Sequence, residues 1–284
     1  MKHYTLEHPY FGRCLYATND VVEIIIPLDY GIRIGHFSFC GGQNVFYQQP
    51  HDMTELTTPA GWRVRGGHRI WLAPESEKVY CPDNEPIQFE ILDNGVLLTQ
   101  QEDPWLRIKK SMRIIFSGGA ELEVTNRIEK TGEEPLSGAI WAISVMAPGG
   151  TEEISFALRE GGMDHWRRIS MWDHTSLGDP RAEYRRDGIR LRHSPIDLRY
   201  KIGIGHPLSP VRYENNGVTF IKAFPVMEDL EYPDGNVSFE TFMCKHMLEI
   251  ESLSPLMTIP AGQTREHTEL WRLCKSENEG GTFA

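Results

Sequence analysis

Short stretches in which apolar and polar residues alternate recur along the whole chain. From Glu121 to Ile128 the apolar side chains fall mostly at every second position, the period of a strand with one wet face. Comparable runs rich in Val, Ile, Phe and Tyr predict strands at residues 21–26, 32–39, 109–116, 120–128, 140–146, 189–192, 218–224, 236–243, 247–253 and 268–273. Turn sequences separate them, among them Gly41-Gly42, Asn94-Gly95, Gly118-Gly119, Asp187-Gly188, Asn216-Gly217 and Pro233-Asp234-Gly235.

No stretch shows a sustained helical period with caps, and strands do not alternate with helices. No repeat, low-complexity linker or block of charge marks a domain boundary. We therefore expect a single all-β domain over residues 1–284, with a flexible tail from about residue 276. About ten or more antiparallel strands in one domain favour a large β-sandwich of two packed sheets, or a closed barrel.

Charge narrows the range of partners. The formal net charge is −11, so nucleic acid and anionic membranes are not expected to bind the main surface. The net charge does not exclude a local basic pocket that binds a sugar phosphate. The first residues contain no apolar run of the kind found in a signal peptide, and residues 21–28 are too short to span a bilayer, so a cytoplasmic location is expected.

Five cysteines are scattered without a C-x-x-C spacing, which favours buried, reduced thiols over a zinc site. No dinucleotide fingerprint, phosphate-binding loop or Gly-x-Ser-x-Gly elbow is present, and the His-x-His…Glu ligand pattern of cupins is missing. We therefore expect no metal and no cofactor.

The segment from Gly66 to Glu75 combines polar and aromatic side chains in the way that sugar sites do. Its glycine pair permits tight backbone geometry beside His68, Arg69, Trp71 and Glu75. Planar hydrogen-bonding groups suit vicinal hydroxyls, and an indole ring suits the C–H face of a sugar. A purely structural alternative is equally weighted: Trp71 in the core, His68 capping a turn, and Arg69 paired with Glu75.

Three glutamates gather near the C-terminus. Glu249 and Glu251 are two residues apart, so on one strand they share a face, and Glu240 on the preceding strand could lie nearby across a hairpin. Carboxylates that share a face repel one another, which raises a pKa and can produce a general base. The alternative is a solvated outer face.

The order of these elements resembles the galactose mutarotase-like superfamily, which includes aldose 1-epimerase. The resemblance is carried by a Pro-x-x-x-Gly-x-Arg turn at 27–33, by Gly66-Gly67-His68-Arg69, and by the glutamate strand and Pro-x-Gly at 248–262. It spans nearly the whole chain, and segments 66–75, 141–150 and 232–235 are most similar to an uncharacterised branch. It implies a large antiparallel β-sandwich, a supersandwich, with a carbohydrate as the ligand.

The resemblance also implies roles for individual residues. Glu251 corresponds best to the catalytic base, with Glu249 in reserve, and His68 to a histidine of the cleft. The substrate-binding arginine corresponds to Arg33 or Arg69. In the implied mechanism a carboxylate takes the proton of the anomeric hydroxyl, a histidine protonates the ring oxygen, and the ring opens and closes again.

One departure from the family pattern bears on the reaction. Aldose epimerases carry a second histidine on a central strand, and the matching stretch here, residues 139–146 around Trp141, has none. Loops could bring in His165, His174 or His206. The segments 164–166 and 172–174 pair Asp with His, but they lack a third convergent metal ligand.

Two lysines within apolar strands, Lys201 and Lys222, could supply a cationic group in place of the missing histidine. If they point inward, they suit an acidic or phosphorylated sugar. Trp141, Tyr232, Asp234 and Glu240 complete the side chains expected to bind substrate. Two functions remain open: a mutarotase- or epimerase-like isomerase, and a non-catalytic carbohydrate-binding domain on the same fold. The sugar and the oligomeric state are not specified by the sequence.

Overall fold

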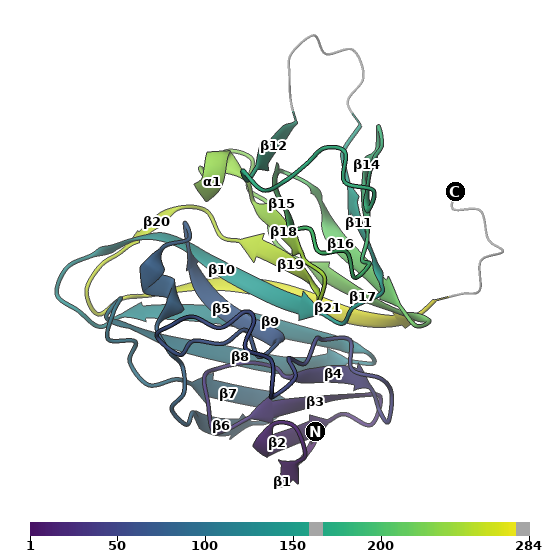
Figure 1. The fold of residues 1–284 in the computed structure, drawn as a ribbon. Helices are drawn as coiled ribbons and strands as arrows, with labels where there is room; N and C mark the ends of the chain where they lie inside the picture. The colour runs from purple at the N-terminus through teal and green to yellow at the C-terminus, as the bar shows by residue number, and fades with distance from the viewer. Residues whose placement is uncertain (159–166, 277–284) are drawn as a thin grey trace.

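The structure is a computed structural model that describes residues 1–158 and 167–276 (Figure 1). Within these ranges the chain forms three sheets, and every strand pair is antiparallel. The helical elements described are a single 3-10 turn, η1 (Glu77–Tyr80), and α1 (Pro233–Asn236). Asp234 and Gly235 inside α1 have positive φ angles, so this segment is a tight turn, as its Pro-Asp-Gly sequence predicts. The all-β prediction is confirmed.

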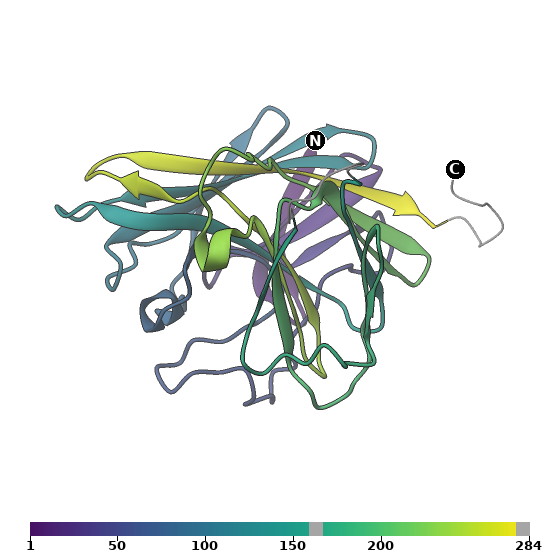
Figure 2. The same ribbon diagram turned by 90° about the horizontal axis from the view of Figure 1, so that it is seen from above.

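The largest sheet has ten strands in the order β13-β14-β11-β16-β17-β21-β9-β8-β7-β6 within the described residues. Their bounds are β6 (Gln88–Leu92), β7 (Gly95–Thr99), β8 (Ile108–Gly118), β9 (Glu121–Lys130), β11 (Thr151–Ser155), β13 (Ala182–Tyr184), β14 (Gly188–Arg192), β16 (Leu208–Asn215), β17 (Val218–Ala223) and β21 (Thr264–Lys275). The long strand β21, yellow in Figures 1 and 2, runs across the molecule and joins the two halves of this sheet.

A second sheet packs against the first and has seven strands in the described part of the chain. Its main order is β12-β15-β18-β19-β10-β20, and β5 pairs with the other edge of β10. The bounds are β5 (Gly67–Ala73), β10 (Leu136–Met146), β12 (Arg168–Met171), β15 (Tyr200–Gly205), β18 (Phe239–Met243), β19 (Leu248–Leu253) and β20 (Met257–Ile259). Strand β10 is buried from Gly138 onwards because it lies between β5 and β19.

The N-terminal strands form a separate four-stranded meander, purple in Figure 1. Its strands are β1 (Lys2–His8), β2 (Gly12–Thr18), β3 (Val22–Pro27) and β4 (His36–Phe39). The apolar side chains of β3 join the common core, whereas β1 is largely exposed.

Aromatic rings connect the N-terminal meander to the ten-stranded sheet. Phe37 of β4 and Phe46 contact Trp271 of β21 and Phe220 of β17, with ring centroids 5.4–6.2 Å apart among them. Rings at these separations in tilted and edge-on arrangements contribute both apolar burial and favourable quadrupole contacts. The three sheets share one hydrophobic core.

The predicted strands agree with the structure except at a few boundaries. The strand predicted at 32–39 is regular only from His36, because Ile34 is bridged to His68 rather than to a neighbouring long strand. The strand predicted at 236–243 begins at Phe239, because Asn236 has a φ of 69° and ends the preceding turn. The sequence predicts site residues but no strand in the segment that starts at Gly66, and the structure forms strand β5 there.

All five cysteines are free thiols. Cys14, Cys81 and Cys244 are buried, but Cys40 is exposed and Cys274 is half-buried, so the expectation of uniformly buried thiols is wrong. In the ranges that the structure describes, no helix has the length and apolar character needed to span a lipid bilayer.

Candidate functional site

Strand alternation sorts the side chains of β5 onto two faces. Arg69 and Trp71 point to one face of the seven-stranded sheet, and His68 and Ile70 point to the other, between the sheets. Strand β10 runs antiparallel beside β5 and places Trp141 directly opposite Trp71. The face that carries the two tryptophans is called here the outer face of the sheet.

Two glutamates meet on this outer face. Glu240 of β18 lies directly opposite Glu251 of β19 in the antiparallel register. Glu249 lies two residues before Glu251 on the same strand, and its Oε1 accepts a hydrogen bond from Nη2 of Arg69 at 3.1 Å. The prediction that Glu249 and Glu251 share a face with Glu240 nearby is confirmed, and the alternative of a solvated face is wrong because all three are buried.

A lysine from β15 lies between the two opposed carboxylates. Nζ of Lys201 is 2.9 Å from Oε2 of Glu240 and 3.4 Å from Oε2 of Glu251. The same Oε2 of Glu251 accepts a hydrogen bond from Nε1 of Trp141 at 2.8 Å. The Lys201 ammonium also lies over two indole rings, 4.4 Å from the centroid of Trp141 and 4.7 Å from that of Trp172.

Aromatic rings also surround the arginine. The Arg69 guanidinium lies 4.6 Å from the ring centroid of Trp71 and 5.5 Å from that of Trp62. The ring of Tyr80 contacts both indoles edge-on, at 5.2 Å from Trp62 and 4.9 Å from Trp71. Indole and phenol rings of this kind give flat apolar surfaces beside charged donors, the combination that suits a sugar ring.

Seven residues make up this site, called here the Glu251 cluster: Arg69, Trp71, Trp141, Lys201, Glu240, Glu249 and Glu251. Several of its polar atoms lack a hydrogen-bond partner although they are buried. They are Nε and Nη1 of Arg69, both carboxylate oxygens of Glu240, and Oε1 of Glu251. The contact between Lys201 and Glu240 is therefore an ion pair by distance without hydrogen-bond geometry. Buried polar atoms are rarely left unpaired, so the cluster presents free donors and free acceptors to a ligand.

Burial sets the protonation of the two opposed carboxyls. It raises the pKa of Glu251 to about 7, although Lys201 opposes the rise. Burial also raises the pKa of Glu240 well above its usual range, and the neighbouring Glu251 adds to that rise. Burial disfavours the charge on Lys201, but Glu251 and Glu240 outweigh it and raise the pKa of the ammonium. The lysine stays charged, and a proton is available to the two carboxyls near neutral pH.

Solved structures with the same architecture have very low sequence identity to this chain. A galactose mutarotase related enzyme from Lactobacillus acidophilus is 8% identical, with a TM-score of 0.54 over 99% of this chain and 100% of its own. A galactose mutarotase-like protein from Clostridium acetobutylicum is 8% identical, with a TM-score of 0.55 over 96% of this chain and 98% of its own. A TPR-domain containing protein from Parabacteroides distasonis is 13% identical, with a TM-score of 0.61 over 94% of this chain, which spans only 48% of that protein.

The chain has the galactose mutarotase-like fold. The sequence itself matches no family model and no curated protein. At such low identity the likeness establishes the fold and leaves the reaction to be argued from the site. The fold class and the resemblance expected from the sequence are confirmed.

Within the galactose mutarotase-like fold of this chain, His68 lies on the inner face of β5. Its ring bonds Ser144 at 2.9 Å and Asn126 at 3.1 Å, and it packs against Trp271 at 4.6 Å. Burial and the nearby Lys222 hold its pKa well below the usual range. His68 and its neighbour Arg69 point to opposite faces of the sheet, and Glu251 lies on the face of Arg69. The sheet therefore separates His68 from Glu251, and the prediction that both act on one sugar is wrong.

Lys222 is also placed between the sheets. Its Nζ lies 2.8 Å from Oε1 of Glu269 and donates to the carbonyl oxygens of Ala142 at 2.9 Å and Ile250 at 3.1 Å. Its ammonium is held between the sheets and does not reach the outer face, so its predicted contact with a substrate at the Glu251 cluster is wrong. Lys201, in contrast, is on the outer face of the sheet in the Glu251 cluster, and its strand β15 lies between β12 and β18, not at a sheet edge.

The two candidate arginines have different positions. Arg33 is buried, pairs with Asp83 at 2.6 Å and donates to the carbonyl oxygens of Val64 and Gly66 at 3.0 Å. These bonds fix the backbone that leads into β5. Arg69 is the arginine of the Glu251 cluster, and its carboxylate partner is Glu249, not Glu75.

The remaining predicted residues lie around or beyond the cluster. Glu75 is exposed, accepts a hydrogen bond from the hydroxyl of Tyr80, and raises the pKa of Lys201 through its charge. Asp234 is half-buried in α1, and its charge raises the pKa of Glu240. Tyr232 hydrogen-bonds Met227 and Asn236 instead of the cluster.

Sequence reasoning missed three aromatic residues of the site: Trp62, Tyr80 and Trp172. They come from loops and a 3-10 turn, where no periodic pattern indicates the direction of a side chain. Trp172 stands beside His174, which is exposed and contacts Phe242. Asp164, His165 and Trp166 lie outside the described residues.

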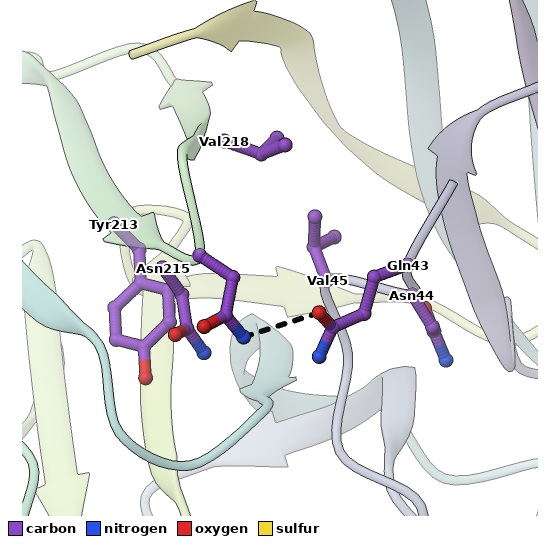
Figure 3. Close-up of a pocket in the computed structure, with 7 residues that line it drawn as sticks. Gln43, Asn44, Val45, Tyr213, Asn215 and Val218 are labelled. Atoms are coloured by element: carbon purple, nitrogen blue, oxygen red, sulfur yellow. Dashed lines mark hydrogen bonds between the residues drawn. The ribbon is translucent and has the colours of Figure 1, made fainter. Parts of the chain in front are cut away.

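Two hollows lie elsewhere on the molecule. The one in Figure 3 is lined by Gln43, Asn44, Tyr213 and Asn215, with Gln43 accepting a hydrogen bond from Asn216, and its volume of about 20 Å³ suits about one water molecule. The other, of about 410 Å³, lies between residues 81–85 and 100–105. Neither contains a residue predicted to bind substrate. Within the described chain, no three His, Cys, Asp or Glu side chains are arranged to hold a metal ion.

Proposed function

We propose that the protein is a carbohydrate-active isomerase that interconverts the anomers of an aldose, with Glu251 as the base. The observation that supports this proposal is the Glu251 cluster itself. It combines a carboxyl group, Glu251, whose pKa is about 7, with free buried donors and acceptors and flanking indole rings. That is the chemistry needed to hold a sugar ring and to move a proton at its anomeric centre.

Glu251 is the stronger candidate for the base because its Oε2 accepts from an indole N–H. Nε1 of Trp141 can only donate, so this oxygen must accept, as a carboxylate does. Oε1 of the same group has no partner and is free to take the proton of the anomeric hydroxyl. A pKa of about 7 also matches a base that works near neutral pH.

The charges of the cluster favour a neutral sugar over a phosphorylated one. Arg69 faces Glu249, and Lys201 faces Glu240 and Glu251, so each cation of the cluster already has a carboxylate partner. A phosphate or uronate brought to this face would find no cation that lacks a carboxylate partner. We therefore infer that an uncharged aldose is the substrate class.

Entry to the cluster requires a side chain to move. Glu240 and Glu251 are fully buried, and Lys201 lies against both with its side chain 7% exposed. The Lys201 side chain has four rotatable bonds, and ion pairs and two ring contacts hold it in place. A sugar hydroxyl can replace these contacts, so Lys201 is the side chain that would move when a sugar enters.

A non-catalytic sugar-binding domain is the second candidate. It is favoured by one observation: in the ranges that the structure describes, no histidine hydrogen-bonds or pairs with Glu240 or Glu251. A binding domain would use the same rings and the same free polar atoms without turnover.

The test is magnetisation-exchange NMR of anomer interconversion over glucose, galactose, mannose and their 6-phosphates. We expect the wild-type protein to accelerate exchange of a neutral aldose, and Glu251→Gln to lose about 100-fold or more of that acceleration. Glu152→Gln is the matched control, since Glu152 is equally buried but hydrogen-bonds Thr241. Line broadening of a sugar without faster exchange would instead support the binding domain, and faster exchange only of the phosphates would overturn the inferred substrate class.

A further inference from the structure

We propose that Glu240 is the acid of the reaction, donating the proton that the ring oxygen takes up as Glu251 removes the one on the anomeric hydroxyl. This inference rests on the proposed function and supplies the group for which the sequence offers no histidine. It assigns a proton-transfer role to a residue that the sequence suggests only as a sugar contact.

The first support is the register of the sheet. Glu240 and Glu251 are directly opposite one another on β18 and β19, so their Cβ atoms are about 5 Å apart on the same face. Lys201 contacts one oxygen of each carboxyl, which shows that the two groups converge. The anomeric hydroxyl and the ring oxygen are both bonded to C1, so two converging carboxyls can reach both oxygens of a single sugar.

The second support is the difference in hydrogen bonding. Glu251 accepts from Trp141, a donor that favours its ionised form. Neither oxygen of Glu240 makes a hydrogen bond with proper geometry, although the side chain is completely buried. Lys201 is the one charged donor near this carboxyl in the described residues, 2.9 Å from Oε2, and burial still raises the pKa of Glu240 well above its usual range, so the pair is expected to hold a single proton at neutral pH, on Glu240.

The surrounding charges are consistent with this distribution. The charged groups that act on the pair are Lys201 of β15, Arg69 of β5, Glu249 of β19 and Asp234 of α1. Burial, Glu251 and Asp234 raise the pKa of Glu240, and Lys201 lowers it. Burial and Glu249 raise the pKa of Glu251, whereas Lys201, Arg69 and the Trp141 hydrogen bond lower it, so the rise stops at about 7. Two carboxyls in one site whose environments differ in this way are suited to separate roles as acid and base.

The step balances in protons and electrons. Oε1 of Glu251 takes the proton of the C1 hydroxyl, the C1–O1 bond becomes a carbonyl, and the bond from C1 to the ring oxygen breaks. The ring oxygen takes the proton of Glu240, leaving Glu251 neutral and Glu240 ionised. Rotation about C1–C2 and the reverse transfers close the other anomer and restore both groups. No oxidant, reductant or metal is needed.

The variant that tests the assignment is Glu240→Gln. Glutamine has the shape and neutral charge of a protonated glutamate, so the Lys201–Glu251 pair and sugar binding should be kept. It cannot transfer the proton, so exchange should slow about 100- to 10,000-fold with little change in the sugar's dissociation constant measured by NMR titration. Glu152→Gln controls for the loss of a buried carboxyl outside the cluster.

Two readouts separate a proton donor from a structural residue. The wild-type exchange rate should rise with pH through about 7 as Glu251 ionises. At higher pH the rate should fall as Glu240 loses its proton, and the Glu240→Gln variant should not show this fall. Burial also raises the pKa of Glu152 well above its usual range, so infrared spectra are recorded in the Glu152→Gln background, where a protonated-carboxyl band at neutral pH should be removed by Glu240→Gln.

Each failure has its own meaning. Wild-type-like exchange with an intact falling limb in Glu240→Gln, while Glu251→Gln is inactive, would overturn the role of Glu240 and leave the proposed function standing. A wild-type protein that accelerates no aldose would overturn both. A protonated-carboxyl band that Glu240→Gln leaves unchanged in the Glu152→Gln background would place the neutral-pH proton elsewhere and overturn the assignment.

Discussion

At the scale of single residues, the behaviour of the site depends on one ammonium group. Lys201 lies within 3.4 Å of two buried carboxyls and over the rings of Trp141 and Trp172. Its charge is the counter-ion that allows Glu251 to ionise in a buried position. A buried ion pair adds little net stability relative to apolar groups, but removing one partner leaves an uncompensated charge.

Lys201→Met should therefore destabilise the protein in a pH-dependent way. Without the ammonium, the pKa values of Glu240 and Glu251 in the folded state rise further above their unfolded values. The folded state then binds more protons than the unfolded chain, so the free energy of unfolding falls as pH rises. Urea denaturation at pH 8 should show a loss of about 3–5 kcal/mol, and a smaller loss at pH 5. An equal loss at both pH values would contradict this explanation.

At the scale of elements, β5 shows what sequence can and cannot predict. The composition of Gly66 to Glu75 predicted a concentration of site residues, and Arg69 and Trp71 lie in the Glu251 cluster, which we propose as the site. The same composition could not show that the segment is a central strand, and strand parity removes His68 from the site. Adjacent residues in a loop can share a pocket, whereas in a strand they cannot.

The glycine pair before β5 is required by close backbone contacts. Gly67 has a φ of +75°, and a Cβ there would stand 2.4 Å from the carbonyl oxygen of Ile34. Gly217 has the same φ of +75° with nothing within 4 Å of such a Cβ. Comparing the two positions separates backbone strain from steric clash.

Gly67→Ala should lower the free energy of unfolding by about 3 kcal/mol or more, and Gly217→Ala by only about 1–2 kcal/mol. The first value includes displacement of the Ile34 and Tyr47 backbones that bridge to β5, and the second contains strain alone. Equilibrium denaturation of both variants measures the difference. Equal losses would show that the contact with Ile34 relaxes without cost.

At the scale of the whole molecule, the strand pattern predicted the fold class and most of the long strands. Exposed strands such as β1 were missed because none of their side chains enters the core. The pairing of Glu240 with Glu251 was foreseen from a hairpin, but the approach of Lys201 depends on β15 joining β18 from about 40 residues away in sequence. Contacts of that range are set by sheet order, which local patterns do not encode.

The two large sheets are also connected by a polar network. Lys222 of β17 pairs with Glu269 of β21 and donates to carbonyl oxygens of β10 and β19 in the opposite sheet. Ser252 of β19 completes the connection, because its hydroxyl contacts His267 at 2.7 Å and donates to Glu269 at 2.5 Å. This network replaces apolar packing at the centre of the sandwich, so its charges must remain paired.

Lys222→Met should therefore cost about 3–5 kcal/mol in the free energy of unfolding, because it leaves the Glu269 carboxylate unpaired in the core. Arg127→Met is the matched control: Arg127 of β9 pairs with Glu266 of β21 in the same sheet, at 2.9 Å but near solvent, and its loss should cost less than about 1 kcal/mol. Adding Glu269→Gln to Lys222→Met should recover part of the loss, since the second change removes the stranded charge. If the Lys222 variant is no less stable than the Arg127 variant, the sheets are held together by apolar contacts alone, and the buried pair contributes nothing to joining them.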